Sequence, residues 1–193
     1  GADAELAGAT IQSGISGEGG YVSRFKDTAS KLYDQLDKHV PPDTPIPVNA
    51  TKAYLAQAVT PTKGAEATTS LLVNPKLQQI DSALSADIAA AANGTLPYEA
   101  VKSLRSRVGA LQADSGLTSD IPKAELKKLY GALSQDMKAQ AYKTPDGAKA
   151  FNRADNFYRE GIQKLDKIEH VVKRAGGPEK VFTAAMSGTN EGA

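Results

Sequence analysis

Apolar residues recur along most of this chain at steps of three and four, the spacing that places them on one face of a helix. The first such series consists of Tyr21, Phe25, Ala29, Leu32, Leu36 and Val40. It predicts a helix over residues 21–39, which Pro41 and Pro42 end because proline lacks an amide donor and obstructs the preceding turn. Residues 41–49 contain four prolines and must be extended.

Further helices are predicted by the same spacing and by residues suited to helix ends. A short helix follows Asn49, and residues 65–73 are ambiguous. Asn74 and Pro75 fit the cap and the first position of a helix, and Asn93-Gly94 tolerates the positive φ that ends one. These signals predict a helix from residue 74 to about residue 92.

The second half of the chain has the three most regular helical patterns. These helices begin near Pro97, near residues 120–122 and at Thr144-Pro145, and the last runs to about Arg174. Short connections between long helices favour antiparallel neighbours. No apolar stretch has the length and alternation of a sheet strand.

We therefore expect an all-α protein: an antiparallel helical bundle with an extended proline-rich segment and flexible termini. The expected parts are a Gly/Ala-rich tail (1–20), a helix with its proline-rich connector and short helices (21–73), a bundle of about four helices (74–175), and a short helix with a tail (176–193). The first helix either joins the bundle or projects from it. The linker-like ends indicate a fragment of a longer protein or a mature product with mobile tails.

Composition limits the class of protein. Of the 193 residues 40% are hydrophobic, but alanine supplies 31 and Val, Ile, Leu and Phe together only 38, so the core is thin. A net charge of +1, from 23 basic and 22 acidic residues, argues against disorder and against a strongly basic nucleic-acid binder. Without cysteine there is no disulfide, zinc-thiolate site or thiol nucleophile. No apolar run is long enough to span a membrane.

Candidate catalytic and metal-binding groups are few. Asp166, Glu169 and His170 share a helix face and could touch a divalent ion, although pairing with neighbouring cations explains them more simply. Asp34 and Asp37 are helix-face neighbours, but they alternate with lysines as on an ordinary solvated face. We expect no catalytic residue, no bound metal and no cofactor.

Basic side chains on two successive predicted helices are candidates for nucleic-acid contact. Arg105 and Arg107 lie on the first of these helices, and Lys127 and Lys128 lie on the second. They could neutralise phosphates if they shared one face. Interleaved acidic residues favour instead a bundle surface held by ion pairs.

Aromatic residues of the bundle are candidates for a subunit interface. The candidate interface residues are Tyr98, Tyr130, Phe157 and Tyr158. Tyrosine is enriched at interfaces, but it also packs at the edge of a core with its hydroxyl bonded or solvated. Both interpretations stay open.

Three glycines lie inside predicted helices, where each costs about 1 kcal/mol relative to alanine. They are Gly109, Gly131 and Gly161. Close helix crossings within the bundle explain all three, and contacts between protomers are the rival explanation.

Residues 96–168 carry three runs that point to a family: Leu-Arg-x-x-Val-Gly at 104–109, Leu-Tyr-Gly-Ala-Leu-Ser at 129–134 followed by Asp-Met at 136–137, and Phe-x-Arg-Ala-x-x-Phe-Tyr-Arg-x-Gly at 151–161. This segment resembles part of large structural proteins of tailed bacteriophages and prophages, often described as internal virion, DNA-injection or DNA-ejection proteins. The resemblance covers a little over a third of the chain and carries no catalytic residue with it.

The resemblance implies a non-enzymatic protein of the virion, delivered to the bacterial host cytoplasm or made there. Its expected role is particle assembly or genome delivery, through helix-mediated contacts with a second copy of itself or with other virion proteins. One alternative is a DNA-contacting module used in packaging or ejection. The other is a metal-dependent or peptidoglycan-active enzyme fragment centred on residues 166–170. A thin core would also ease partial unfolding during passage through a tail, because little apolar area is lost at about 25 cal/mol per Å².

Overall fold

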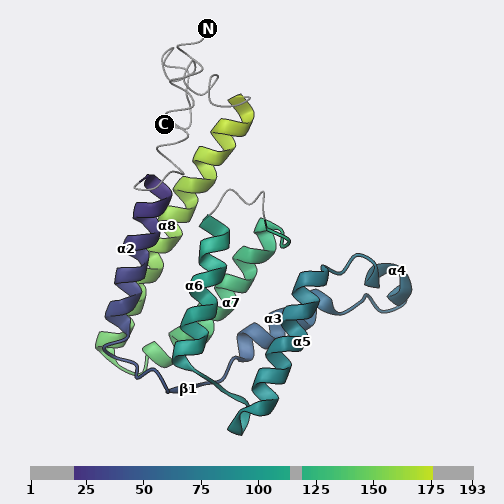
Figure 1. Ribbon diagram of the computed structural model, residues 1–193, viewed down its shortest axis with the longest axis horizontal. Helices are drawn as coiled ribbons and strands as arrows, with labels where there is room; N and C mark the ends of the chain where they lie inside the picture. The colour runs from purple at the N-terminus through teal and green to yellow at the C-terminus, as the bar shows by residue number, and fades with distance from the viewer. Residues whose placement is uncertain (1–19, 114–118, 176–193) are drawn as a thin grey trace.

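The computed structural model describes residues 20–113 and 119–175, and it is built of α-helices (Figure 1). The described helices are α2 (Tyr21–Leu36), α3 (Asn49–Val59), α4 (Glu66–Ser70), α5 (Pro75–Ala90), α6 (Tyr98–Ala113), α7 (Lys123–Ala141) and α8 (Pro145–Ala175), with a 3-10 turn at Ala92–Gly94. The predicted all-α class is confirmed. Residues 1–19 of the expected tail (1–20) and the whole of the expected short helix and tail (176–193) lie outside the described residues.

Helix ends follow the local signals in the sequence. The Asn74 side-chain oxygen accepts a hydrogen bond from the Leu77 amide at 3.0 Å, and Thr144 Oγ1 accepts one from the Gly147 amide at 3.1 Å. Asn93 and Gly94 have φ values of 64° and 65°, in the left-handed region that residues just past the end of a helix commonly adopt. The first helix is shorter than predicted, since it ends at Leu36 and gives way to turns.

The proline-rich segment is extended, as predicted, but it also forms a strand that the sequence pattern does not predict. Strand β1 (Pro45–Ile46) pairs antiparallel with β2 (Leu96–Pro97). The Tyr98 amide donates to the Thr44 carbonyl at 2.8 Å, which extends the contact to the start of α6. Prolines in both strands lack amide donors and keep the sheet short.

The helices pack as three adjacent pairs, α2 with α8, α6 with α7, and α3 with α5 (Figure 1). Helix α2 joins the bundle, which settles the choice left open by the sequence. Helix α5, expected within the bundle, packs mainly against α3, and α3 in turn packs against α7. The apolar stripe of α5 consists of the buried Leu77 and Leu84 and the partly buried Ile80 and Ile88.

A carboxylate from α7 fixes the start of α3. Asp136 accepts hydrogen bonds from the amides of Ala50 and Thr51, both at 3.0 Å, and from the Thr51 hydroxyl at 2.6 Å. Free amides and the helix dipole make this end of a helix favourable for a negative charge. Asp136 is buried, so this cap joins the outer pair of helices to the bundle core.

Two of the three helical glycines lie where helices cross closely. A Cβ atom at Gly161 would overlap the ring of Phe25 on α2, and one at Gly109 would lie 3.0 Å from the Tyr130 ring. Helix crossings within the bundle therefore explain both. The same explanation is wrong for Gly131, because a Cβ atom there would meet nothing within 4 Å.

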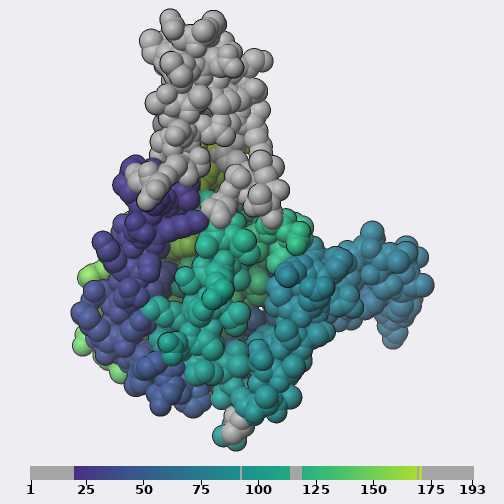
Figure 2. Space-filling model, in the orientation of Figure 1, coloured from purple at the N-terminus to yellow at the C-terminus, as the bar shows by residue number. Residues whose placement is uncertain are grey.

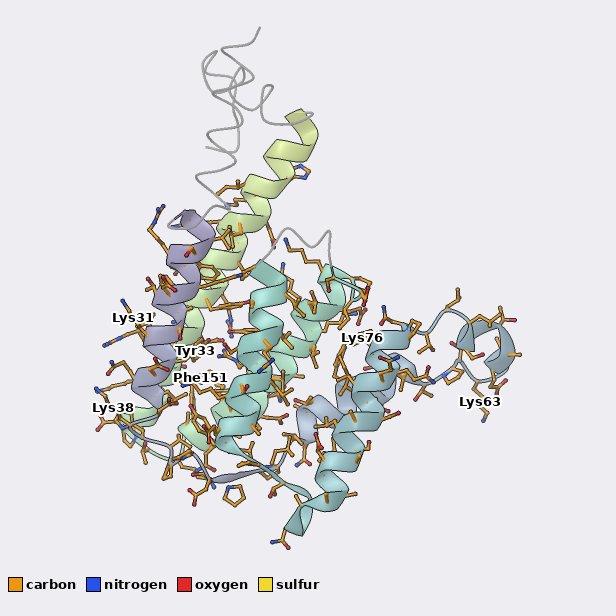
Figure 3. The ribbon with its side chains drawn as sticks, in the orientation of Figure 1. Lys31, Tyr33, Lys38, Lys63, Lys76 and Phe151 are labelled. Atoms are coloured by element: carbon orange, nitrogen blue, oxygen red, sulfur yellow. The ribbon has the colours of Figure 1, made fainter. Side chains whose placement is uncertain are left out.

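The segment around α4 projects from the rest of the molecule as an arm (Figure 2). Lys63 lies near its far end and Lys76 near its base (Figure 3). The arm exposes Leu71 and Leu72 almost fully, at 84% and 80%. Over the described residues, no helix combines the length and apolar character needed to cross a membrane.

Candidate functional site

A groove of about 770 Å³ runs between α7 and α8. Its walls are built by residues spaced three and four apart on the two antiparallel helices. The α7 wall extends from Lys127 to Tyr142, and the α8 wall extends from Phe151 to Gln163. Gly131 faces this groove, which accounts for the empty space beside that glycine.

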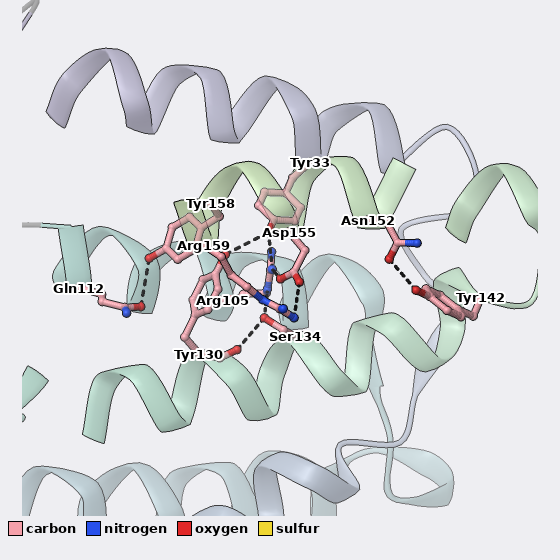
Figure 4. A network of polar contacts seen from close by, with 10 residues as sticks. All are labelled: Tyr33, Arg105, Gln112, Tyr130, Ser134, Tyr142, Asn152, Asp155, Tyr158 and Arg159. Carbon is pink, nitrogen blue, oxygen red and sulfur yellow. Dashed lines mark hydrogen bonds and ion pairs between the residues drawn. The ribbon is translucent and has the colours of Figure 1, made fainter. Parts of the chain in front are cut away.

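A buried arginine lies beneath the groove. Arg105 of α6 is 3% exposed, and its guanidinium carbon lies 4.0 Å from the centre of the Tyr33 ring and 4.4 Å from that of Tyr130. Its Nε donates to Ser134 Oγ at 2.6 Å, and its Nη2 donates to the Tyr33 hydroxyl (Figure 4). Cation–π contact and hydrogen bonds together offset the cost of burying this charge.

Asp155 of α8 supplies the opposite charge in the same network (Figure 4). One of its oxygens lies 3.3 Å from Arg105 Nη2, and the other lies 2.7 Å from Arg159 Nη2. Ser134 Oγ donates to the Tyr130 carbonyl at 2.7 Å. Among the described residues, every buried side-chain nitrogen and oxygen has a hydrogen-bond partner. The polar floor of the groove is therefore complete without a ligand.

Stacked tyrosines form the apolar part of the floor. The rings of Tyr130 and Tyr158 stack at 4.1 Å, and the Tyr158 hydroxyl lies 3.0 Å from the Gly109 carbonyl. Burial raises the pKa of Tyr33, Tyr130 and Tyr158 above the ordinary value, although the positive charge of Arg105 opposes this rise. All three hydroxyls are therefore protonated at neutral pH, and each bonds to a partner within the chain.

Three cations lie along the groove and outnumber its one carboxylate. Lys127 and Arg159 have side chains that are 53% and 69% exposed, and Lys138 Nζ lies 4.9 Å from the centre of the Tyr142 ring. Lys127 also pairs with Asp166 at 2.9 Å. Arg159 pairs with Asp155 at 2.7 Å, so carboxylates offset two of these three cations.

The structure corrects the predicted subunit interface. Tyr98, Tyr130 and Tyr158 are buried within the chain, and Phe157 is half-buried against the core. The Tyr98 hydroxyl donates to Asp37 Oδ1 at 3.0 Å, and burial raises the pKa of Tyr98. Core packing, the alternative weighed for these residues, describes the three tyrosines, because rings inside the bundle are not available to a second subunit.

The predicted nucleic-acid residues do not share one face. Arg105 points into the core, whereas Arg107 is exposed. Lys127 pairs with Asp166, and Lys128 lies 3.5 Å from Glu125 on its own helix. Phosphate contact needs cations on the surface, so Arg105 does not belong to such a set.

Asp166 of the candidate metal site and the carboxylates of Asp34 and Asp37 form ion pairs with lysines. Asp166 lies 3.2 Å from Lys123 Nζ and 2.9 Å from Lys127 Nζ, while His170 is exposed. Lys102 bridges Asp34 and Asp37. In the described part of the chain, no three acidic or histidine side chains are grouped to hold a metal, and the Glu169 side chain lies outside that part.

Sequence reasoning missed Ser134, Asp155 and Arg159, although a signal was present. Arg105 occupies an apolar position between Val101 and Val108 on α6. Asp155 does the same between Phe151 and Tyr158 on α8. Opposite charges on the core faces of two helices indicate a buried ion pair, because isolated buried charges are costly.

Comparison with protein families, curated proteins and solved structures gives no match to this chain. The groove and its floor are therefore interpreted from their own geometry.

Proposed function

We propose that this protein is a non-enzymatic structural component of a phage or prophage particle, and that it acts in assembly or genome delivery by holding a helix of another protein in the α7/α8 groove. The resemblance of residues 96–168 to phage structural proteins supports the setting. The open groove over a fully bonded floor supports the mode of action.

The chemistry of the groove favours recognition over catalysis. General acid–base work needs a titratable group within reach of a substrate. The carboxylate of Asp155 lies between two guanidinium groups, the Ser134 hydroxyl bonds to the backbone, and burial keeps the tyrosines protonated. What remains accessible is a surface of small and polar side chains over buried rings, with Gly131, Gln135, Ala139 and Gln163 exposed, and such a surface suits contact with another protein.

The test measures this chain in purified particles. Induction of the source strain, particle purification and quantitative mass spectrometry should find the chain at a fixed number of copies per particle. Gly131→Leu fills the groove with a side chain and should lower that number at least tenfold. Ala86→Leu, on the exposed face of α5, is the matched control and should leave the number unchanged. Absence of the wild-type chain from particles would overturn the proposed function.

A further inference from the structure

We infer that copies of this chain associate head to tail, with the α4 arm of one copy docking on the outer face of α6 in the next. The α4 arm comprises residues 60–73, and the outer face of α6 is formed by Leu104, Arg107 and Leu111. Neither surface lines the α7/α8 groove, so the inference does not rest on the proposed function.

The α4 arm presents two adjacent leucines that the described part of the chain does not cover. Leu71 and Leu72 are 84% and 80% exposed, and the arm projects away from the rest of the molecule (Figure 2). No residue of the segment 60–73 is buried. Single exposed leucines are common on protein surfaces, but two adjacent ones on a projecting segment are typical of contact with another molecule.

A complementary apolar surface lies on α6. Leu104 and Leu111 are 38% and 40% exposed and lie on one face of that helix, two turns or roughly 10.5 Å apart. This spacing leaves room for an apolar side chain between them, as when ridges and grooves of two packed elements interlock. The leucines of the arm and of α6 are four of the five large apolar side chains that are exposed among the described residues.

The contact joins two copies of the chain. Within one copy the leucines of the arm and those of α6 all remain exposed, so they do not cover each other. Donor and acceptor are different surfaces, and each copy therefore keeps one free arm or one free α6 face after a first contact forms. Repetition of such a heterologous contact gives a ring or a filament.

Opposite charges accompany the two apolar patches. Glu66 begins α4, five residues before Leu71, and Arg107 lies between the two leucines of α6, about one turn from each. Both charged side chains are exposed, and neither forms an ion pair within the described part of the chain. The Gly64 amide donates to Glu66 at 3.0 Å and lowers the pKa of this carboxyl, which is therefore charged at neutral pH. Glu66 of one copy complements Arg107 of the next.

Charge also argues against a lipid surface as the occupant. Lys63 and Glu66 are the charged residues of the segment 60–73, so the α4 arm has no net charge. Docking on an anionic membrane depends on clusters of basic residues. The matching patch and the opposite charge on α6 therefore make a second copy the better partner.

Association between copies should be weak and progressive. Two leucines and one ion pair bury much less than the surface of a standard interface, which is about 1,600 Å². Sedimentation velocity of the full chain should therefore show monomers at micromolar concentration and species larger than a dimer near millimolar concentration.

Mixing two variants tests the head-to-tail arrangement. Leu71→Gln with Leu72→Gln removes the donor, and Leu104→Gln with Leu111→Gln removes the acceptor. Each variant alone should associate at least tenfold more weakly than the wild type. An equimolar mixture should form dimers and nothing larger, because each pair retains one intact arm and one intact α6 face. Tyr142→Gln removes the fifth exposed large apolar side chain and, as the matched control, should leave association unchanged.

Charge reversal tests the pair of Glu66 and Arg107. Glu66→Lys or Arg107→Glu alone should weaken association at least threefold. A chain with both substitutions should associate as the wild type does, because the two opposite charges have changed places. Lys31→Glu alters the charge at an exposed position of α2 and should have no effect. Circular dichroism melting shows that every variant is folded.

Several outcomes would overturn the inference. A wild-type chain that stays monomeric at millimolar concentration would do so, and so would association that stops at dimers. Failure of the mixed variants to form dimers would show that the α4 arm and α6 are not partners. Binding to vesicles of anionic phospholipid that is lost in the arm variant, without association between copies, would assign the arm to a lipid surface instead.

Discussion

Arg105 shows what a single buried charge demands of its surroundings. Its guanidinium directly contacts rings or oxygens from three other helices, α2, α7 and α8. A buried ion pair contributes little net stability compared with apolar residues of the same volume, but removal of one partner leaves an uncompensated charge. The pair therefore fixes which residues of the four bundle helices face one another.

Removing one partner of this pair should be far more damaging than replacing both. Arg105→Met should lower the free energy of unfolding by about 3–5 kcal/mol, because Asp155 then stays buried with only Arg159. Arg105→Met with Asp155→Leu should recover most of that loss. Urea denaturation of both single variants and the double variant measures the coupling. Additive losses would contradict this account.

The helical glycines should respond in opposite directions to the same substitution. Gly131→Ala should raise the free energy of unfolding by about 1 kcal/mol, since the new methyl group meets open space and the helix gains propensity. Gly161→Ala should lower it, because the methyl group overlaps the Phe25 ring. The comparison by urea denaturation needs no further control, because each variant serves as the control for the other.

Buried tyrosines predict the response of stability to alkaline pH. Their folded-state pKa values lie above the unfolded value of about 10, so the unfolded chain releases protons first as pH rises. The free energy of unfolding should not change with the titration of these tyrosines near neutral pH. It should fall once the pH passes about 10. Urea denaturation at pH 8 and pH 11 measures the fall, and Tyr158→Phe should reduce it. An unchanged slope in that variant would show that Tyr158 is not part of the effect.

At the scale of single helices, local signals act independently of the fold. Asn74, Thr144 and Asn93-Gly94 mark ends correctly because capping and positive φ depend on a few adjacent residues. Which helices pair depends on contacts far apart in sequence, and the position of α5 beside α3 was not predictable from its own pattern. The groove was not predictable for the same reason: Gly131 has the same sequence signature as Gly161, yet one faces space and the other an aromatic ring.

The cap that α7 supplies to α3 is a contact between elements that can be measured. Asp136→Ala removes three hydrogen bonds to residues 50 and 51 and should lower the free energy of unfolding by about 2 kcal/mol. Asp87→Ala, at an exposed position of α5, is the matched control and should change it by less than about 0.5 kcal/mol. Equal effects of the two substitutions would show that the Asp136 cap does not stabilise the protein.

At the scale of the whole molecule, three pairs of helices share a core of aliphatic and aromatic side chains that also encloses polar groups. The Arg105–Asp155 ion pair is buried within this core. Val, Ile, Leu and Phe together supply only 38 of the 193 residues, so we expect moderate stability.

Thermal unfolding tests that expectation. Differential scanning calorimetry should give a Tm well below about 90 °C, the threshold commonly used for hyperstable proteins. Urea denaturation followed by circular dichroism is an independent check on the same chain. A Tm above that threshold would contradict the idea that a thin core eases unfolding.

The short pairing of β1 with β2 has a consequence for how this architecture can vary. Pro45 lies opposite Pro97, so the chain enters and leaves the segment from α3 to α5, which carries the α4 arm, at nearly the same point. Helix α3 packs on α7, but the length of the α4 arm does not alter the path of the bundle helices before and after that point. An arm of different length or tip chemistry could be exchanged there by recombination, and one scaffold could then reach different neighbours.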